Sequence, residues 1–260
     1  MAGNHELEVL QQAVRQAGQQ VLKLAAEGFE THIKKDHSPV TTADLAVNQI
    51  LHDLLLTAFP HDAWLSEESP DDPRRLENKR VWVIDPIDGT KYFMRGVPQY
   101  AISVALVESH QPVVTAVYNP ATDELFSAVR GMGAWLNGQP IHVTSGQDGR
   151  PVVLVNPSAL ERGIFRAIEA AAECRPMGSI AYTLALVAAG RADATLNLDG
   201  LNEWDVAGGV LLIEEAGGMV MDRNGSPLSF NQAKTTIRGI LAADKDLLGR
   251  LLTFTHTLSR

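Results

Sequence analysis

Val81-Trp82-Val83-Ile84-Asp85-Pro86-Ile87-Asp88-Gly89-Thr90 is the segment around which this 260-residue chain is organised. Its first four residues are apolar and mostly β-branched, they follow a charged cluster, and Pro86 comes soon after them. A short apolar run with such borders predicts a fully buried strand. The chain then delivers two carboxylates, those of Asp85 and Asp88, from a proline-stiffened turn beyond the C-terminal end of the strand.

The residues after this turn favour a cation and a phosphate in one place. Gly89 and Thr90 follow the two aspartates, and residues 91–94 can begin a helix. A hard cation takes carboxylate and carbonyl oxygens, and a phosphate takes N–H groups at a helix N-terminus. The alternative is an Asp-rich turn whose side chains cap their own backbone. The short motif by itself does not decide between the two.

Composition restricts the class of protein. The length suits one large domain or two small ones, and 45% hydrophobic residues is ordinary for a globular chain. A net charge of −9, from 22 basic and 31 acidic residues, argues against a nucleic acid polymer as partner. The single cysteine, Cys174, excludes an internal disulfide. No apolar run reaches the roughly 18 residues of a membrane span, and residues 1–5 show no signal-peptide core, so we expect a cytoplasmic protein.

Two helices are predicted before the central stretch. Apolar residues at spacings of three and four predict an amphipathic helix over residues 6–27, ended by Gly28. After a polar loop, Thr41 or Thr42 can cap a second helix that carries Asp44 in its first turn. The helix dipole alone would account for an acid at that position.

Two adjacent acids precede the central stretch. Residues 63–65 predict a short strand, and Glu67 and Glu68 emerge from its end. Such a pair is either solvated surface or part of a site. Residues 70–80 are charged and rich in proline, which predicts a mobile loop beside the pair.

The rest of the chain predicts layers of helix and sheet. Strand patterns and turn dipeptides indicate an antiparallel region at residues 100–107, 113–118 and 124–129, with a hairpin at Asn137-Gly138. Helical patterns follow at residues 159–172, 179–189, 203–216 and 244–254, with strands at 219–221 and 237–242. We therefore predict an α+β fold in two lobes, residues 1–145 and 146–260, that form one compact catalytic unit.

Three separated motifs, taken together, carry a resemblance to a known family. In chain order they are Trp64-Leu65-Ser66-Glu67-Glu68, the central stretch, and Glu203-Trp204-Asp205-Val206-Ala207-Gly208-Gly209 with Glu215-Ala216-Gly217-Gly218 behind it. They resemble the inositol monophosphatase superfamily over nearly the whole chain. The resemblance implies a layered αβαβα fold and a magnesium-dependent, lithium-sensitive phosphomonoesterase.

The resemblance also implies the metal ligands. Glu67, Asp85 and the carbonyl of Ile87 would hold a first magnesium ion, and Asp85, Asp88 and Asp205 would hold a second. A third, weaker ion would lie near Glu67. Elementary chemistry agrees, because paired divalent ions stabilise the attacking and leaving oxygens of an in-line displacement. Gathered carboxylates would also repel one another unless cations neutralised them.

The remaining site residues follow from the same resemblance. Backbone N–H groups of Gly89 and Thr90 would bind the phosphate, and the Thr90 hydroxyl and Glu68 would orient the attacking water. Asp44 would accept a hydrogen bond from Thr90, and Lys35 would neutralise charge nearby. Further substrate contacts are expected from Asp88, Lys91, Gly178, Ser179 and Asp205.

Markers for the substrate are mixed. Lys91, residues 38–41 and the run Glu203-Trp204-Asp205 resemble the 3′(2′),5′-bisphosphate nucleotidase branch. Residues 95–98 resemble the histidinol phosphatase branch, and residues 130–138 the inositol monophosphatases. Where inositol enzymes carry a ring-contacting glutamate, this chain has Leu198, with Asp199 one residue away. We therefore prefer adenosine 3′,5′-bisphosphate as substrate and keep inositol 1-phosphate and histidinol phosphate as alternatives.

A nucleotide needs an apolar wall for its base and a cation for its second phosphate. Candidates for the wall are Leu198, Leu201 and Tyr182, and candidates for the cation are Lys91, Arg95 and Arg191. The non-enzymatic alternative is a regulatory module that binds a phosphate ligand without hydrolysing it. We expect no membrane partner, and a homodimer is compatible with the sequence.

Overall fold

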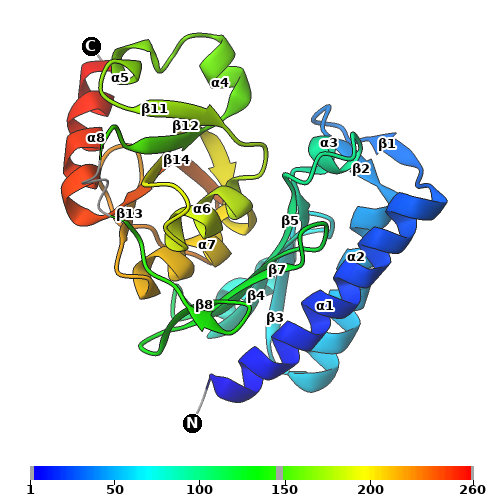
Figure 1. Ribbon diagram of the computed structural model, residues 1–260. Helices are drawn as coiled ribbons and strands as arrows, with labels where there is room; N and C mark the ends of the chain where they lie inside the picture. Colours follow the sequence, from blue (N-terminus) through cyan, green and yellow to red (C-terminus); the bar gives the residue numbers. More distant parts are fainter. Residues whose placement is uncertain (1–2, 145–148, 259–260) are drawn as a thin grey trace.

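The computed structural model describes residues 3–144 and 149–258. Its helices and sheets alternate in five layers, as Figure 1 shows. From one side to the other these are helices α1 (Asn4–Glu27) and α2 (Thr42–Ala58), a seven-stranded sheet, helices α6 (Ile180–Ala188) and α7 (Glu203–Glu215), a five-stranded sheet, and helix α8 (Lys245–Leu258). The predicted αβαβα layering is therefore confirmed.

The seven-stranded sheet contains the central stretch. In spatial order its strands are β3 (Ala63–Ser66), β4 (Arg80–Asp88), β5 (Ala101–Glu108), β6 (Gln111–Asn119), β7 (Glu124–Val129), β8 (Gly133–Leu136) and β9 (Gln139–Pro140). Strands β3 and β4 are parallel, and every other neighbouring pair is antiparallel. The predicted antiparallel region and its hairpin are confirmed.

The end of β4 differs from the expected turn. The strand continues to Asp88, and its pairing with β5 shifts register between Asp85 and Asp88. Pro86 lies inside this shift, where its missing N–H leaves no gap in the ladder of hydrogen bonds. The two aspartates therefore stand on a bulged, buried strand end, and Asp85 is only 2% exposed.

The five-stranded sheet was only partly foreseen. In spatial order its strands are β11 (Glu173–Pro176), β10 (Val152–Val155), β12 (Ala194–Asn202), β14 (Thr236–Ala243) and β13 (Met219–Met221). The predicted helix over residues 159–172 is wrong, because two short helices stand there, α4 (Pro157–Glu161) and α5 (Arg166–Glu169). Gly163 between them has φ 72°, a left-handed conformation that an α-helix does not contain.

Three small elements complete the first lobe. Strands β1 (Thr31–Ile33) and β2 (Pro39–Thr41) form a hairpin, and α3 (Thr90–Phe93) follows β4 directly. The stretch at residues 70–80 contains a 3₁₀ helix, η1 (Pro73–Glu77), with Arg75 only 2% exposed. The expected loop is therefore helical in part, with this arginine packed into the molecule, and the mobility of the stretch stays a prediction.

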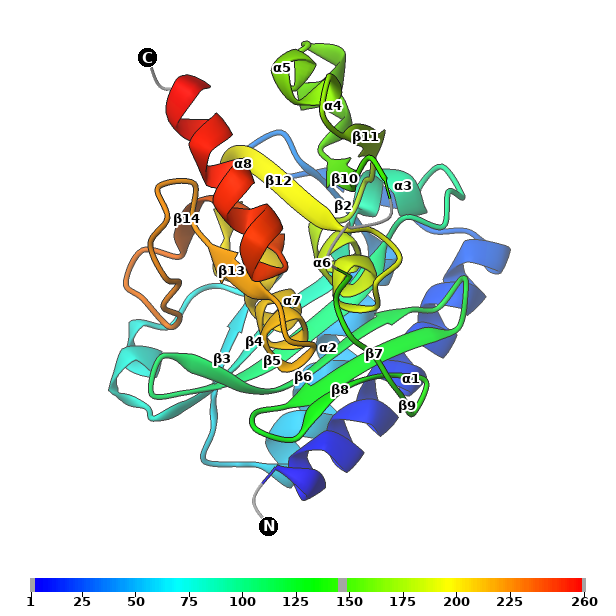
Figure 2. The ribbon, with the colours of Figure 1, turned by 60° about the vertical axis from the view of Figure 1, so that its left-hand side comes forward.

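The two sheets stack through α6 and α7, which lie between them in Figure 2. One large apolar cluster spans this junction and includes residues of β5, α6 and α7. The first sheet ends at Pro140 and the second begins at Val152. The predicted lobe boundary at residues 145–146 lies outside the described residues and stays a prediction. None of the described helices is long and apolar enough to cross a membrane.

Candidate active site

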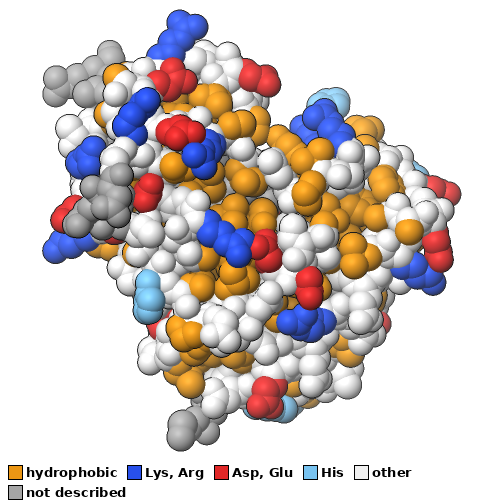
Figure 3. Space-filling model, in the orientation of Figure 1, with side chains coloured by type: hydrophobic (Ala, Val, Ile, Leu, Met, Phe, Trp, Pro, Cys, Tyr) orange, Lys and Arg blue, Asp and Glu red, His pale blue; other side chains and the backbone are white. Residues whose placement is uncertain are grey.

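A cavity of about 350 Å³ opens between the lobes at the C-terminal end of β4. Figure 3 shows a face of the molecule that is hollowed between the lobes, with apolar side chains along the hollow. From the first lobe the cavity is lined by Asp36, Ser38, Glu67, Asp85, Ile87, Asp88, Gly89, Thr90, Lys91 and Tyr92. From the second lobe it is lined by Val155, Asn156, Met177, Gly178, Thr195, Asn197, Leu201, Asn202 and Asp205.

Three aspartates reach the cavity from different elements. Asp85 Oδ1 accepts a hydrogen bond from Ile87 N at 3.0 Å, which fixes its carboxylate inside the bulge. Asp88 Oδ2 accepts from Ser179 Oγ at 2.5 Å and from Ala181 N at 2.6 Å, at the first turn of α6. Asp205 Oδ2 accepts from Asn202 N at 2.7 Å, within a capping box at the start of α7.

Burial and crowding change the titration of these acids. Burial, with the charges of Glu67, Asp88 and Asp205, raises the pKa of Asp85 well above its usual range. Burial, with the charge of Asp88, does the same to the pKa of Asp205. Burial raises the pKa of Asp88 to about 7, although the hydrogen bonds from Ser179 and Ala181 act in the opposite direction. The cluster therefore favours a neutralising cation.

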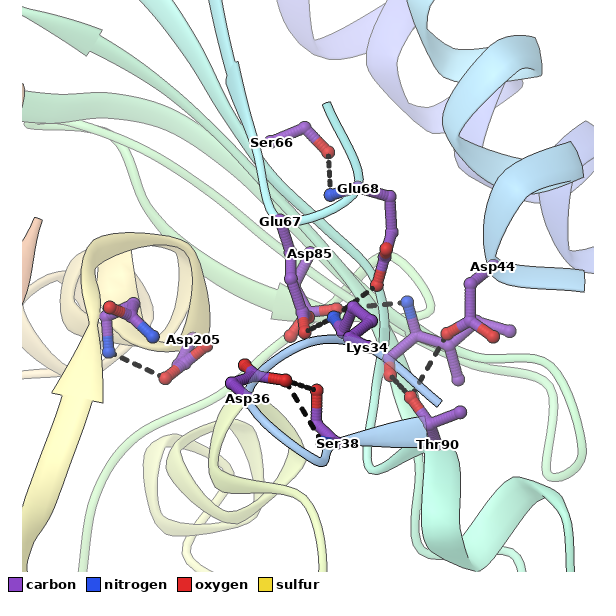
Figure 4. A network of polar contacts seen from close by, with 12 residues as sticks. Lys34, Asp36, Ser38, Asp44, Ser66, Glu67, Glu68, Asp85, Thr90 and Asp205 are labelled. Atoms are coloured by element: carbon purple, nitrogen blue, oxygen red, sulfur yellow. Dashed lines mark hydrogen bonds and ion pairs between the residues drawn. The ribbon is translucent and has the colours of Figure 1, made fainter. Parts of the chain in front are cut away.

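Lys34 supplies one such positive charge. Its Nζ donates to Glu67 Oε1 at 2.5 Å and to Glu68 Oε1 at 2.9 Å, as Figure 4 shows. Burial lowers the pKa of Lys34, but the hydrogen bonds to Glu67 and Glu68 outweigh it and raise the pKa overall. The Glu68 side chain is 5% exposed, and burial raises its pKa.

The sequence prediction named Lys35 for this role, and the contact belongs to its neighbour. Lys35 is exposed, whereas the Lys34 side chain is 22% exposed and lies against the two glutamates. Lys34 directly follows β1, where the chain is extended and successive side chains point to opposite sides. A shift of one residue therefore decides which lysine reaches the site.

The predicted contact between Thr90 and Asp44 is present. Thr90 Oγ1 lies 3.1 Å from Asp44 Oδ1 and 3.0 Å from Ile87 O, and its single proton can be donated to either acceptor. Asp44 is 1% exposed, and its Oδ2 accepts from Thr41 N at 2.7 Å and Thr41 Oγ1 at 2.6 Å. This capping box at the start of α2 holds Asp44 in place, so the carboxylate is both a cap and a partner of the site.

Gly89 is required by the shape of the turn into α3. Its φ is 92°, and an added Cβ would lie 2.8 Å from the backbone oxygen of Gln99. Only glycine tolerates both conditions. Its backbone, with that of Thr90, faces the cavity at the position where the sequence predicts phosphate binding.

The expected leaving-group residues are only partly brought together. Lys91, Gly178 and Leu201 line the cavity, whereas Tyr182 and Arg191 bind Glu124 instead. The other candidates, Arg95 and Leu198, are not among the lining residues, and Asp199 forms an ion pair with Arg162 at 3.4 Å. Lys91 is therefore the only Lys or Arg among the described residues that line the cavity.

Several lining residues were missed by the sequence analysis. Asn156 follows β10, Met177 follows β11, and Thr195 and Asn197 lie on β12. No motif marks them, and β10 to β12 were not recognised as strands. A continuous apolar run at 152–155 and alternating apolar residues at 194–198 were the available signal.

The donor set suits a hard cation such as magnesium. Carboxylates and the carbonyl of Ile87 are the oxygens that such an ion prefers. In the described part of the chain, no three His, Cys, Asp or Glu side chains are gathered closely enough to hold a metal by themselves. Magnesium does not require this, because it is usually held by one or two carboxylates together with waters and substrate phosphates.

These observations define a class of protein: a layered α+β fold with an acid-rich cavity suited to a cation and a phosphate at the junction of its lobes. The model of the inositol monophosphatase family matches residues 4–258, and the chain belongs to this family. Membership indicates a phosphatase that hydrolyses phosphomonoesters.

Known relatives cover nearly the whole chain. An inositol-1-monophosphatase of Rhizobium meliloti (strain 1021) is 36% identical over 236 residues, which are 86% of this chain and 88% of the relative. The extragenic suppressor protein suhB from Bartonella henselae superposes with a TM-score of 0.85 at 30% identity, over 95% of this chain and 97% of that one. The 2′AMP-bound structure of SaIMPase-II superposes with a TM-score of 0.81 at 26% identity, over 95% and 91%.

We expect Lys34→Met to bind Mg²⁺ about tenfold more tightly than the wild type in the absence of substrate, a gain of about 1.4 kcal/mol. The reason is that Nζ occupies the position from which a cation would contact Glu67 and Glu68. Calorimetric titration with Mg²⁺ measures the effect. Lys35→Met, which removes the same charge one residue away, is the matched control, and an equal gain in both variants would contradict the prediction.

Proposed function

We propose that the protein is a magnesium-dependent phosphomonoesterase that removes the 3′(2′)-phosphate of adenosine nucleotides, adenosine 3′,5′-bisphosphate first among them. The single observation that carries the phosphatase part is one cavity lined by Glu67, Asp85, Asp88, Asp205 and the Gly89–Thr90 backbone. A cluster of acids would repel a phosphate ester, so cations must stand between them.

The proposed ligand assignment is the one that the family resemblance implies. Glu67, Asp85 and the Ile87 carbonyl would hold one ion, and Asp85, Asp88 and Asp205 would hold another. When bound, magnesium polarises the phosphate and the attacking water and neutralises the charge that develops in the transition state. The protein supplies everything else: it orients the ester, the water and the proton acceptors.

The proposed proton path uses Thr90 and Glu68. If the Ile87 carbonyl is engaged as a ligand, the Thr90 hydroxyl donates to Asp44 Oδ1, 3.1 Å away. Its oxygen then accepts a hydrogen bond from the attacking water, and Glu68 takes up the proton. Two hydrogen bonds from Thr41 hold Asp44 Oδ2, so that Oδ1 keeps the Thr90 hydroxyl in this orientation. Such positioned acid–base assistance typically contributes about 10²–10⁴-fold to the rate.

The leaving-group side of the cavity supports a nucleotide. Met177, Leu201 and Val155 offer apolar surface to a base, and Asn156 and Asn197 can hydrogen-bond to ribose hydroxyls. For a second phosphate, Lys91 is the cation available among the described lining residues. The 2′AMP-bound and inositol monophosphate-bound structures of SaIMPase-II indicate that a related protein of the same fold accommodates a nucleotide monophosphate as well as an inositol phosphate.

Inositol 1-phosphate is the second candidate substrate. The Rhizobium meliloti relative is an inositol-1-monophosphatase. Against it, the expected ring-contacting carboxylate is replaced by Leu198, and the nearby Asp199 is engaged by Arg162. A site is selective for a polyol when its buried polar groups would be left without partners by other ligands. Because the ring-contacting carboxylate is missing here, we expect weak selectivity for inositol.

We expect kcat/KM for adenosine 3′,5′-bisphosphate to exceed that for inositol 1-phosphate and for histidinol phosphate by about tenfold or more, a difference of about 1.4 kcal/mol in transition-state binding. The assay measures phosphate release from all three esters at one magnesium concentration. A preference for inositol 1-phosphate or histidinol phosphate would refute the nucleotide assignment but leave the assignment as a phosphatase intact. Magnesium-dependent binding of the esters with no phosphate release would instead indicate a regulatory module.

Lithium is expected to inhibit at millimolar concentrations, whereas equal sodium is not. After phosphate leaves, the cavity holds carboxylates that lack a counter-ion, and a small hard monovalent ion can trap the product state. This expectation rests on the family more than on hardness alone. Initial rates in LiCl and NaCl at constant ionic strength measure the inhibition. Equal inhibition by both salts would mean that general screening of charges, and not lithium binding, lowers the rate.

A further inference from the structure

A buried polar network joins the two lobes outside the cavity and has no part in the chemistry proposed above. Arg75 belongs to η1 in the first lobe, and Asn231 and Glu203 belong to the second. Their exposed fractions are 2%, 4% and 1%. Figure 2 shows the segment of η1 beside the loop between β13 and β14. We call these three residues the clasp.

The Arg75 side crosses the lobe junction with directional hydrogen bonds. Arg75 Nη1 donates to Asn231 Oδ1 at 2.6 Å, and Nη2 donates to Gln232 O at 3.0 Å. Asn231 Nδ2 donates back to Arg75 O at 3.1 Å. The guanidinium charge is balanced by Asp71, whose Oδ1 accepts from Nε at 2.6 Å. A planar donor fork held on both edges permits one orientation of its partners.

The Glu203 side fixes the same loop to the start of α7. Glu203 Oε2 accepts from Asn231 N at 2.6 Å, and Oε1 accepts from Gln232 N at 2.8 Å. Asn231 has φ 55°, a left-handed conformation that turns two successive N–H groups toward one carboxylate. Glu203 N in turn donates to Thr235 O at 2.9 Å. The first residue of α7 is thus tied to the loop that Arg75 holds.

Each end of the clasp is connected along the chain to an acid of the site. Glu67 lies between β3 and η1 in the first lobe, and Asp205 lies two residues after Glu203 in α7. The lobes also meet through apolar packing, which gives cohesion without direction, and through other hydrogen bonds, such as those that Ser179 and Ala181 donate to Asp88. Directional hydrogen bonds are needed to set the distance between groups that come from separate lobes.

We propose that the clasp of Arg75, Asn231 and Glu203 is a positioning device that sets the separation of the Glu67 and Asp205 carboxylates across the lobe junction. The inference rests on the proposed function, because both carboxylates are assigned there to magnesium. Mutation of residues that orient metal ligands without binding the metal themselves typically changes metal affinity or activity about 10–100-fold.

Asn231→Gly tests the clasp with little disturbance of the fold. Glycine tolerates the left-handed conformation and keeps both N–H groups that bind Glu203, so only the side-chain link to Arg75 is lost. We expect the Mg²⁺ dissociation constant, measured by calorimetry without substrate, to rise about tenfold. The substrate KM at saturating magnesium is expected to stay near the wild-type value. Arg75→Met is expected to weaken Mg²⁺ binding as well. Arg75→Lys, which keeps the charge and removes the fork, is expected to restore only part of the Mg²⁺ affinity that Arg75→Met loses.

Arg74→Gln is the matched control. Arg74 is the neighbour of Arg75, its side chain is 85% exposed, and it forms an ion pair with Asp72. This variant is expected to keep the wild-type Mg²⁺ affinity. All measurements are made well below the melting temperature of each variant, so that loss of folded protein does not enter.

A purely structural role would give a different result. If Asn231→Gly lowers the melting temperature but keeps the wild-type Mg²⁺ affinity and kcat, the clasp stabilises the fold and the proposal is overturned. The proposed function fails separately, in the wild-type protein, if no Mg²⁺ binding and no phosphate release are found. A wild-type protein that does both, with a variant that matches it, refutes the clasp alone.

Discussion

Asp88→Asn is expected to lower kcat about 10³-fold, because several kcal/mol of transition-state stabilisation depend on a metal-bound charge and each 1.36 kcal/mol is a factor of ten. The fold is expected to survive. An asparagine carbonyl oxygen can accept the hydrogen bonds that Ser179 Oγ and Ala181 N donate to Asp88 Oδ2. Loss of one charge also relieves repulsion with Glu67, which raises the pKa of Asp88 in the wild type.

Two measurements separate chemistry from folding in this variant. Steady-state rates over a range of magnesium concentrations give kcat, and thermal unfolding without metal is expected to show a melting temperature no lower than that of the wild type. Asp53→Asn is the matched control, since Asp53 is 63% exposed and lies outside the cavity. Near-normal turnover of Asp88→Asn, or of wild-type protein in excess chelator, would refute the metal mechanism.

Thr90→Val is expected to lower kcat by about 10²–10⁴-fold, the usual contribution of positioned acid–base assistance. Valine has nearly the shape of threonine but lacks the hydroxyl that contacts Asp44 Oδ1 at 3.1 Å. The KM is expected to change little, because the N–H groups of residues 89 and 90 remain. Asp44 loses one of its donors but keeps both hydrogen bonds from Thr41.

The conservative variant Thr90→Ser decides between a hydroxyl role and a packing role. Serine restores the hydroxyl without the methyl group, so most of the lost turnover is expected to return. Single-turnover phosphate release separates the chemical step from product release. Unchanged turnover in Thr90→Val would mean that the attacking water ionises without help from this side chain.

Local patterns were enough for much of the fold. The helices at both ends, the strand at residues 81–84 and the antiparallel strands after it follow from apolar periodicity and turn residues, which act over a few neighbours. Gly163 shows the limit of this reasoning: an alanine-rich helical pattern over residues 159–172 hid a left-handed residue that divides it into two short helices. The strands β10 to β12 were missed because a short apolar run does not show whether neighbouring strands are available to pair with it.

The candidate site also combines residues that local motifs predict with contacts that depend on the packing of distant segments. The motif acids Glu67, Asp85, Asp88 and Asp205 and the family could be predicted from the residues alone, because residue types and spacings within each motif are local properties. The packing of the layers was needed to show that Lys34 rather than Lys35 contacts Glu67, that Arg191 is engaged by Glu124, and that Arg75 is buried at the lobe junction. These contacts join residues that are 33, 67 and 156 positions apart. Their partners are set by the packing of whole layers, which no local spacing records.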